Sequence, residues 1–145
     1  EAADGAAGVE LAMHLRPDVV VMDVRMPILD GVQATRRLIG DGFITDHGFP
    51  VAVLILTTFH EDEAVHQALR AGASGFLLKN TAPHLLADAI RAVAAGGAWL
   101  DPQVARRLLG DFTARPVTAL RDPGLLRPSV RQREALLVAG KVKAK

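Results

Sequence analysis

The sequence contains no cysteine, no run of about 18 apolar residues and no basic-then-apolar leader. These absences argue against disulfides, a membrane span and secretory export, and they make the cytoplasm the expected location. Half of the 145 residues are hydrophobic, so one packed core is feasible. The chain opens on Glu1 in a segment with helical periodicity, so we expect the natural start to lie upstream.

Charge divides the chain into two unlike parts. Residues 113–145 hold eight of the 17 Lys and Arg residues but only two of the 16 Asp and Glu residues. A basic tail fits a nucleic acid or another acidic partner, and it equally fits a solvated linker. Charge alone does not choose between these interpretations.

Apolar runs and amphipathic segments alternate along residues 1–112. Buried strands are predicted at 18–23, 51–57 and 75–79, because each is a short, continuous apolar run. Helices are predicted after Asp4, Asp30, Thr81 and Asp101 as N-caps, and also over 60–73. This βα alternation predicts an α/β fold with a doubly wound parallel sheet and helices on both faces.

The remainder of the chain is less regular. Residues 113–128 contain three prolines and no sustained period, so they are interpreted as a linker. The segment "SVRQREALLVAG" that follows fits one more helix.

Three polar side chains stand at the carboxyl ends of the predicted strands: Asp23, Thr57 and Lys79. The functional crevice of an open parallel sheet lies at this edge. A carboxylate there can attack phosphorus, while a cation and a hydroxyl stabilise the phosphoryl oxygens. Alone, each residue is more often structural, as a turn cap, a β-branched strand residue or a solvated terminus. Their occurrence at successive strand ends favours a phosphoryl acceptor site.

The stretches "VVVMDVRMPILDG", "VLILTTF" and "RAGASGFLLKN" resemble a CheY-like receiver domain of a two-component response regulator. "AAGGAWLDPQVARRLL" is similar to the exit of the subfamily with a LuxR-type helix-turn-helix. The resemblance implies that Asp23 is the phosphoacceptor, that Thr57 and Lys79 contact the phosphoryl group, and that Phe76 is an aromatic switch. For Phe76, an ordinary core position is an equal alternative. The backbone carbonyl of Arg25 would be a Mg²⁺ ligand beside Asp23.

The sequence also departs from this family. The first strand with its acidic pair, the first helix and most of the second strand have no counterpart, so Mg²⁺ binding and phosphorylation by a sensor histidine kinase should be impaired. In the family order 2-1-3-4-5 the missing strand would lie beside "DVVVMD", and we therefore expect an uncovered apolar edge, poor solubility or oligomers. A homodimer is one such form.

The resemblance divides the chain into a partial receiver domain (1–112), a linker (113–128) and a remnant of a helix-turn-helix output domain (129–145). The reading helix of that domain is missing, so DNA would be bound by the intact parent and not by this chain. The predicted function is phosphoryl acceptance that controls transcription, without an enzymatic activity of its own.

Two alternatives remain beside this function. One is a phosphorylation-independent, receiver-like interaction domain, to which the missing acidic pair gives weight. The other is a haloacid-dehalogenase-like phosphotransferase, which needs a second aspartate where this chain has Arg25.

Overall fold

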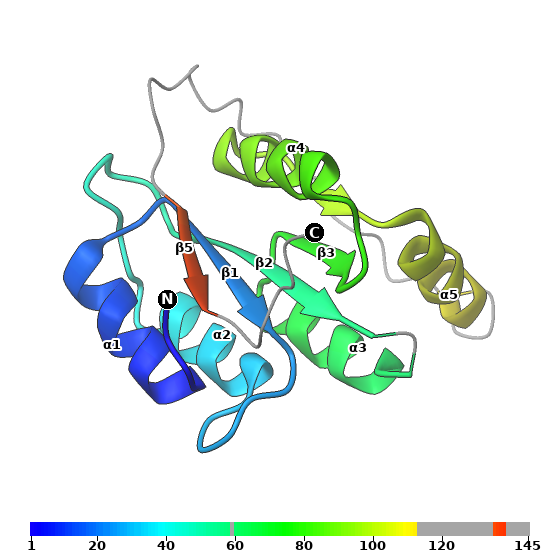
Figure 1. The fold of residues 1–145 in the computed structure, drawn as a ribbon, viewed down its shortest axis with the longest axis horizontal. Helices are drawn as coiled ribbons and strands as arrows, with labels where there is room; N and C mark the ends of the chain where they lie inside the picture. Colours follow the sequence, from blue (N-terminus) through cyan, green and yellow to red (C-terminus); the bar gives the residue numbers. More distant parts are fainter. Residues whose placement is uncertain (59, 113–134, 139–145) are drawn as a thin grey trace.

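The computed structural model describes residues 1–58, 60–112 and 135–138, the last four as backbone (Figure 1). The elements in chain order are α1 (Gly5–Leu15), β1 (Val19–Asp23), α2 (Gly31–Gly40), β2 (Ala52–Thr57), α3 (Asp62–Arg70), β3 (Gly75–Leu78), α4 (Pro83–Ala94), β4 (Trp99–Leu100), α5 (Pro102–Phe112) and β5 (Ala135–Val138). Strands and helices alternate as the sequence predicts. None of the helices described is long and apolar enough to cross a membrane.

The strands form one sheet in the order β4-β3-β2-β1-β5, and every pair is parallel. Asp23 at the end of β1 is paired with Leu56 of β2, and Thr57 is paired with Leu78 of β3. Parallel register therefore brings the ends of β1, β2 and β3 to one edge, which is the placement that the sequence predicts for the site. The predicted α/β fold class is confirmed.

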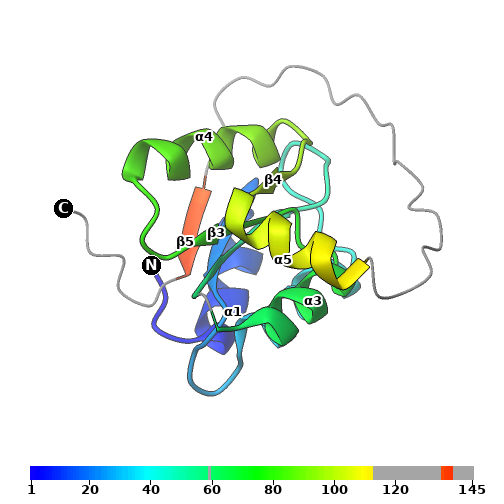
Figure 2. The ribbon, with the colours of Figure 1, turned by 90° about the vertical axis from the view of Figure 1, so that its right-hand side faces the viewer.

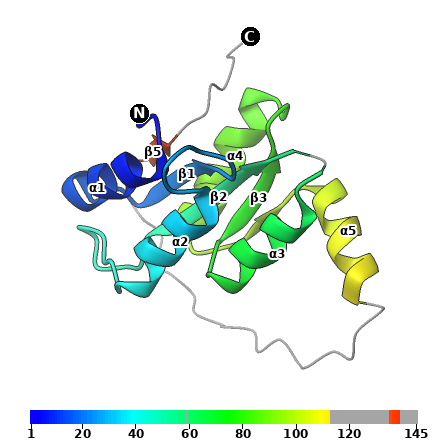
Figure 3. The same ribbon diagram turned by 90° about the horizontal axis from the view of Figure 1, so that it is seen from below.

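Helices cover both faces of the sheet. Figure 3 shows α1, α2, α3 and α5 in a row on the near side of the sheet, with α4 behind it, and Figure 2 shows α4 and α1 on opposite sides. Alternate residues of each strand pack into two apolar clusters. The cluster under α1, α2, α3 and α5 includes Val20, Met22, Val53, Ile55, Phe76, Val104 and Leu108. The cluster under α4 includes Val19, Val21, Leu54, Leu56, Leu77, Ala89 and Val93.

Most of the predicted helix starts are confirmed by hydrogen bonds. Asp4 accepts from the backbone N–H of Ala7, and Asp30 accepts from that of Gln33, each over 2.8 Å. The prediction for Thr81 is wrong, because α4 has Ala82 as its N-cap, without a side-chain hydrogen bond, and Pro83 as its first residue. Proline restricts the preceding residue to an extended conformation, and this sets the boundary.

The largest correction concerns the far edge of β1. Residues 135–138 form the strand β5, so the predicted helix over this segment is wrong at these positions. β5 pairs with Val19–Met22 in parallel, on the side of β1 where the family order places the missing strand, and β1 is therefore not left as an uncovered edge. The four-residue run "ALLV" is apolar and satisfies either pattern, and tertiary pairing decides between them. The predicted linker (113–128) and the rest of the predicted output remnant lie outside the described residues.

Candidate functional site

Asp23, the last residue of β1, carries a buried carboxylate. The residue is only 3% exposed. One oxygen, Oδ2, lies 2.8 Å from Nζ of Lys79, directly after β3. The other, Oδ1, accepts a 3.0 Å hydrogen bond from the backbone N–H of Arg25. A buried charge is stable only when it is paired, and these two donors supply that pairing.

The structure thus brings together two of the three predicted site residues, Asp23 and Lys79. The side chain of Lys79 remains 39% exposed, so its ammonium group can meet a ligand from solvent while it contacts the carboxylate. Both residues occupy the α4 side of the strand pattern, because Asp23 is in register with Leu56 and Leu77 and Lys79 follows Leu77 by two positions. A phosphoryl group on Oδ2 of Asp23 would replace the Asp23–Lys79 contact with a contact between Lys79 and the phosphoryl oxygens.

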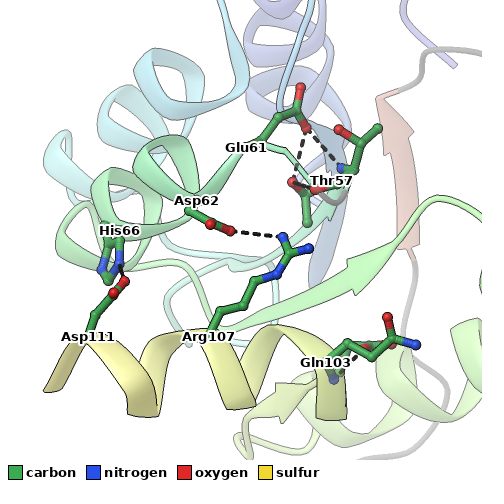
Figure 4. A network of polar contacts seen from close by, with 9 residues as sticks. Thr57, Glu61, Asp62, His66, Gln103, Arg107 and Asp111 are labelled. Carbon is green, nitrogen blue, oxygen red and sulfur yellow. Dashed lines mark hydrogen bonds and ion pairs between the residues drawn. The ribbon is translucent and has the colours of Figure 1, made fainter. Parts of the chain in front are cut away.

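Thr57 belongs to the same edge, but its hydroxyl bonds elsewhere. It lies one position beyond Leu56, so strand alternation directs it to the opposite face from Asp23, toward α3. Its Oγ1 donates to Oε2 of Glu61 over 3.0 Å and lies 3.2 Å from the carbonyl of Thr58 (Figure 4). The predicted role of Thr57 as a phosphoryl contact therefore requires a rotation of this side chain.

Glu61 was not among the predicted site residues. Its carboxylate is almost fully buried and forms three contacts: with the Thr57 hydroxyl, with the backbone N–H of Thr58 at 2.9 Å, and with Nε of Arg25. Burial by itself raises the pKa of Glu61, but the Thr58 backbone N–H, the threonine hydroxyls and Arg25 together hold it below the ordinary value of 4.5. An acidic residue beside a helix N-terminus usually remains in solvent, where it stabilises the helix dipole. The sequence pattern therefore gave no sign that the side chain of Glu61 is buried.

The loop after Asp23 is tightly folded. The N–H of Leu29 donates to the carbonyl of Pro27 over 2.8 Å around Ile28, whose φ is +70°. This is a γ-turn geometry, which is unusual for a β-branched residue. The N–H of Gly31 then donates to the carbonyl of Val24 over 2.9 Å. The turn carries the chain back across the end of β1, so α2 begins directly against the strand.

Phe76 on β3 is 1% exposed and belongs to the cluster under α1, α2, α3 and α5. The ring already lies inward in this structure, as a core residue does. Because the ring is already buried, this structure does not show the outward position from which Phe76 would turn on phosphorylation. The switch role of Phe76 stays a prediction.

A hollow of about 210 Å³ lies beside the strand ends and is lined by Thr57, Thr58, Leu78, Lys79 and Asn80. A second hollow, of about 280 Å³, is lined by residues from the loop after β1 and from the start of α3, among them Arg25, His60 and Glu61. The first hollow gives a small anionic group access to the Lys79 ammonium. The second leaves the Arg25 side of the site open to solvent.

Comparison with known proteins gives one consistent result. Residues 1–91 match the model of the response regulator receiver domain. The chain is 38% identical over 110 residues to the transcriptional regulatory protein DegU of Brevibacillus brevis, covering 75% of this chain and 44% of DegU. It is likewise 38% identical over 109 residues to LiaR of Bacillus subtilis strain 168, covering 75% of this chain and 49% of LiaR. The chain thus spans about half the length of these curated relatives.

Solved structures of response regulators and of a receiver domain are also similar to this chain. A LuxR-family two-component response regulator from Aurantimonas sp. SI85-9A1 superposes with a TM-score of 0.66 at 32% identity, over 78% of this chain and 76% of that one. The receiver domain of a sensor histidine kinase from Pseudomonas aeruginosa PAO1 superposes with a TM-score of 0.50 at 31% identity, over 59% and 67%. That receiver is described with a magnesium ion coordinated in its active site cleft.

Receiver domains bind Mg²⁺ in the active site, as in that structure, but the side chains in the described part of this chain do not form a donor set that fits the ion. Mg²⁺ requires near-octahedral oxygen coordination with carboxylates. Asp23 is the one carboxylate at the strand ends described here, and Lys79 already pairs with it. The carboxylate of Glu61, directly before α3, is held by Arg25 and Thr57. Within the described ranges, no group of three or more His, Cys, Asp or Glu side chains could hold a metal.

Weak magnesium binding is therefore expected for this chain. In a Mg²⁺ titration followed by the amide NMR signals of Asp23 and Arg25, we expect no saturation below about 1 mM, which corresponds to a binding free energy weaker than about 4 kcal/mol. A saturable shift below that concentration, lost in Asp23→Asn, would show that the donor set is more complete than the described residues indicate.

Proposed function

We propose that Asp23 is the phosphoacceptor of this chain, which belongs to the family of response regulator receiver domains. The observation that carries the proposal is the buried Asp23 carboxylate at a strand end, 2.8 Å from the Lys79 ammonium. Receivers of this family accept a phosphoryl group, and their LuxR-type relatives regulate transcription.

The chemistry follows from the two oxygens of Asp23. One of them attacks the phosphorus of a donor, the P–O bond to Asp23 forms, and the bond from phosphorus to the donor's leaving group breaks. Lys79 is placed to neutralise the charge that the phosphoryl oxygens carry during the transfer. Thr57 would donate its hydroxyl proton to one of these oxygens after leaving Glu61.

The proposal extends to a protein of the length of the curated relatives, of which this chain spans about half. A sensor histidine kinase would supply the phosphoryl group, and an output domain would bind DNA. We place this protein in the cytoplasm, because transcriptional regulators act where the DNA is. The proposed role is regulatory rather than enzymatic, since the phosphoryl group stays on the protein as a signal.

The test is the mass of the intact chain after incubation with acetyl phosphate and Mg²⁺. We expect an adduct of about 80 daltons, the mass of one phosphoryl group, in a minor fraction of the chain because the Mg²⁺ donor set is incomplete. The adduct should be absent from Asp23→Asn, an isosteric change that removes the nucleophile.

Two results would contradict this function. An adduct that persists in Asp23→Asn would place the acceptor elsewhere. Complete absence of an adduct at every Mg²⁺ concentration would favour a phosphorylation-independent interaction domain.

A further inference from the structure

Glu61 connects the end of β2 with the loop after β1. Its Oε2 accepts from the Thr57 hydroxyl at the end of β2, and its Oε1 pairs with Arg25 in the loop after β1 (Figure 4 shows the Thr57 contact). Arg25 in turn donates its backbone N–H to Asp23. A single buried carboxylate therefore holds both the hydroxyl and the loop that surround the phosphoacceptor. Buried acids are rare unless all their oxygens are used, as they are here.

The Thr57 hydroxyl has one proton to donate. While this proton is donated to Glu61, with the Thr58 carbonyl as a second and more distant acceptor, it is not available to a phosphoryl oxygen on Asp23. The charge on Glu61 strengthens the Thr57–Glu61 hydrogen bond, because hydrogen bonds to an ionised acceptor are stronger than those between neutral groups. Acceptance of a phosphoryl group with help from Thr57 therefore competes with the Thr57–Glu61 bond.

We propose that Glu61 is a positioning residue that holds the Thr57 hydroxyl away from Asp23 until a phosphoryl group replaces it as the acceptor. The inference rests on the proposed function of Asp23. The held and released positions of Thr57 are two states, and a phosphoryl group favours the released one only through the new hydrogen bond. Weakening the Glu61 bond shifts the balance toward release before phosphorylation.

The experiment compares the wild-type chain with Glu61→Gln, Glu61→Asp and Glu63→Gln. Glu61→Gln keeps the shape and removes the charge, whereas Glu61→Asp keeps the charge and shortens the reach by one methylene. Glu63→Gln is the matched control, because Glu63 is exposed on the first turn of α3 and its carboxylate accepts a hydrogen bond from Gln67. It removes the same charge two residues away without touching Thr57.

The first measurement needs no phosphorylation. Three-bond couplings from the Thr57 methyl carbon to the backbone report its χ1 rotamer. We expect a single rotamer in the wild type and in Glu63→Gln, and rotamer averaging in Glu61→Gln and Glu61→Asp. Unchanged couplings in both Glu61 variants, with amide spectra that show a folded chain, would overturn the proposal whatever happens to phosphorylation.

The second measurement is the rate at which the 80-dalton adduct forms with acetyl phosphate. Replacement of a charge-assisted hydrogen bond by a weaker neutral one predicts about a tenfold faster rate in Glu61→Gln, a faster rate in Glu61→Asp, and an unchanged rate in Glu63→Gln. Rotamer averaging of Thr57 in the Glu61 variants without a faster rate of adduct formation would overturn the proposal, since Glu61 would then be structural only. No adduct in any variant would refute the proposed function instead, and the couplings would still decide whether Glu61 holds the hydroxyl.

Discussion

Removal of residues 135–145 is expected to destabilise the chain and to make it oligomerise. The deletion takes away β5, which pairs with β1 at four positions, from Val19 to Met22. Ladder hydrogen bonds contribute about 0.5–1.5 kcal/mol each, so a loss of about 2–6 kcal/mol in the free energy of unfolding is expected. The strand left at the edge is wholly buried in the intact chain, and an uncovered apolar edge pairs with other chains.

The matched control is a shorter deletion, of residues 139–145, which keeps β5. We expect this variant to unfold at the same urea concentration as the full chain, whereas deletion of 135–145 lowers the midpoint. Light scattering across a range of concentrations should show larger species only for the longer deletion. Equal midpoints and equal masses for the two deletions would show that β5 contributes nothing to the stability of β1.

The placement of Asp23 and Lys79 could be predicted from sequence because it depends on local patterns. Each follows a short apolar run, and parallel strands bring their carboxyl ends to one edge regardless of the details of packing. The contact between the two side chains follows from that topology together with the reach of a lysine. In the structure the Lys79 ammonium and the Asp23 carboxylate lie 2.8 Å apart.

The direction of Thr57 depends on register, which the sequence does not state. A strand alternates its side chains with a period of two, so a shift of one position reverses the face. Pairing of Asp23 with Leu56, rather than with Thr57, places the hydroxyl on the α3 side. The inward turn of Glu61 follows from that placement, because the hydroxyl and the Thr58 N–H together offer it two donors.

The strand β5 was missed for a different reason. "ALLV" is too short and too uniformly apolar for its period to distinguish a helix from a buried strand. Its partner, β1, lies more than a hundred residues earlier in the chain, so only tertiary pairing selects the extended form. Long-range pairing of this kind overrides weak local preference.

Replacement of Gly31 by alanine is expected to have the second large effect. Gly31 begins α2, and a Cβ at this position would lie 2.2 Å from the carbonyl oxygen of Asp23 and 2.9 Å from Cα of Val24. Both are backbone atoms, so the helix start and the strand end must separate. Such overpacking costs about 1–3 kcal/mol in the free energy of unfolding, and it displaces Asp23, the proposed phosphoacceptor.

Gly40→Ala is the control for this change, because Gly40 ends the same helix and a Cβ there meets nothing within 4 Å. That variant should match the wild type or gain up to about 1 kcal/mol from higher helix propensity. Urea unfolding of the two variants gives the difference, and adduct formation with acetyl phosphate under native conditions should fall in Gly31→Ala alone. If Gly31→Ala unfolded at the wild-type midpoint and kept its adduct, close contact between α2 and the end of β1 would not be what positions Asp23.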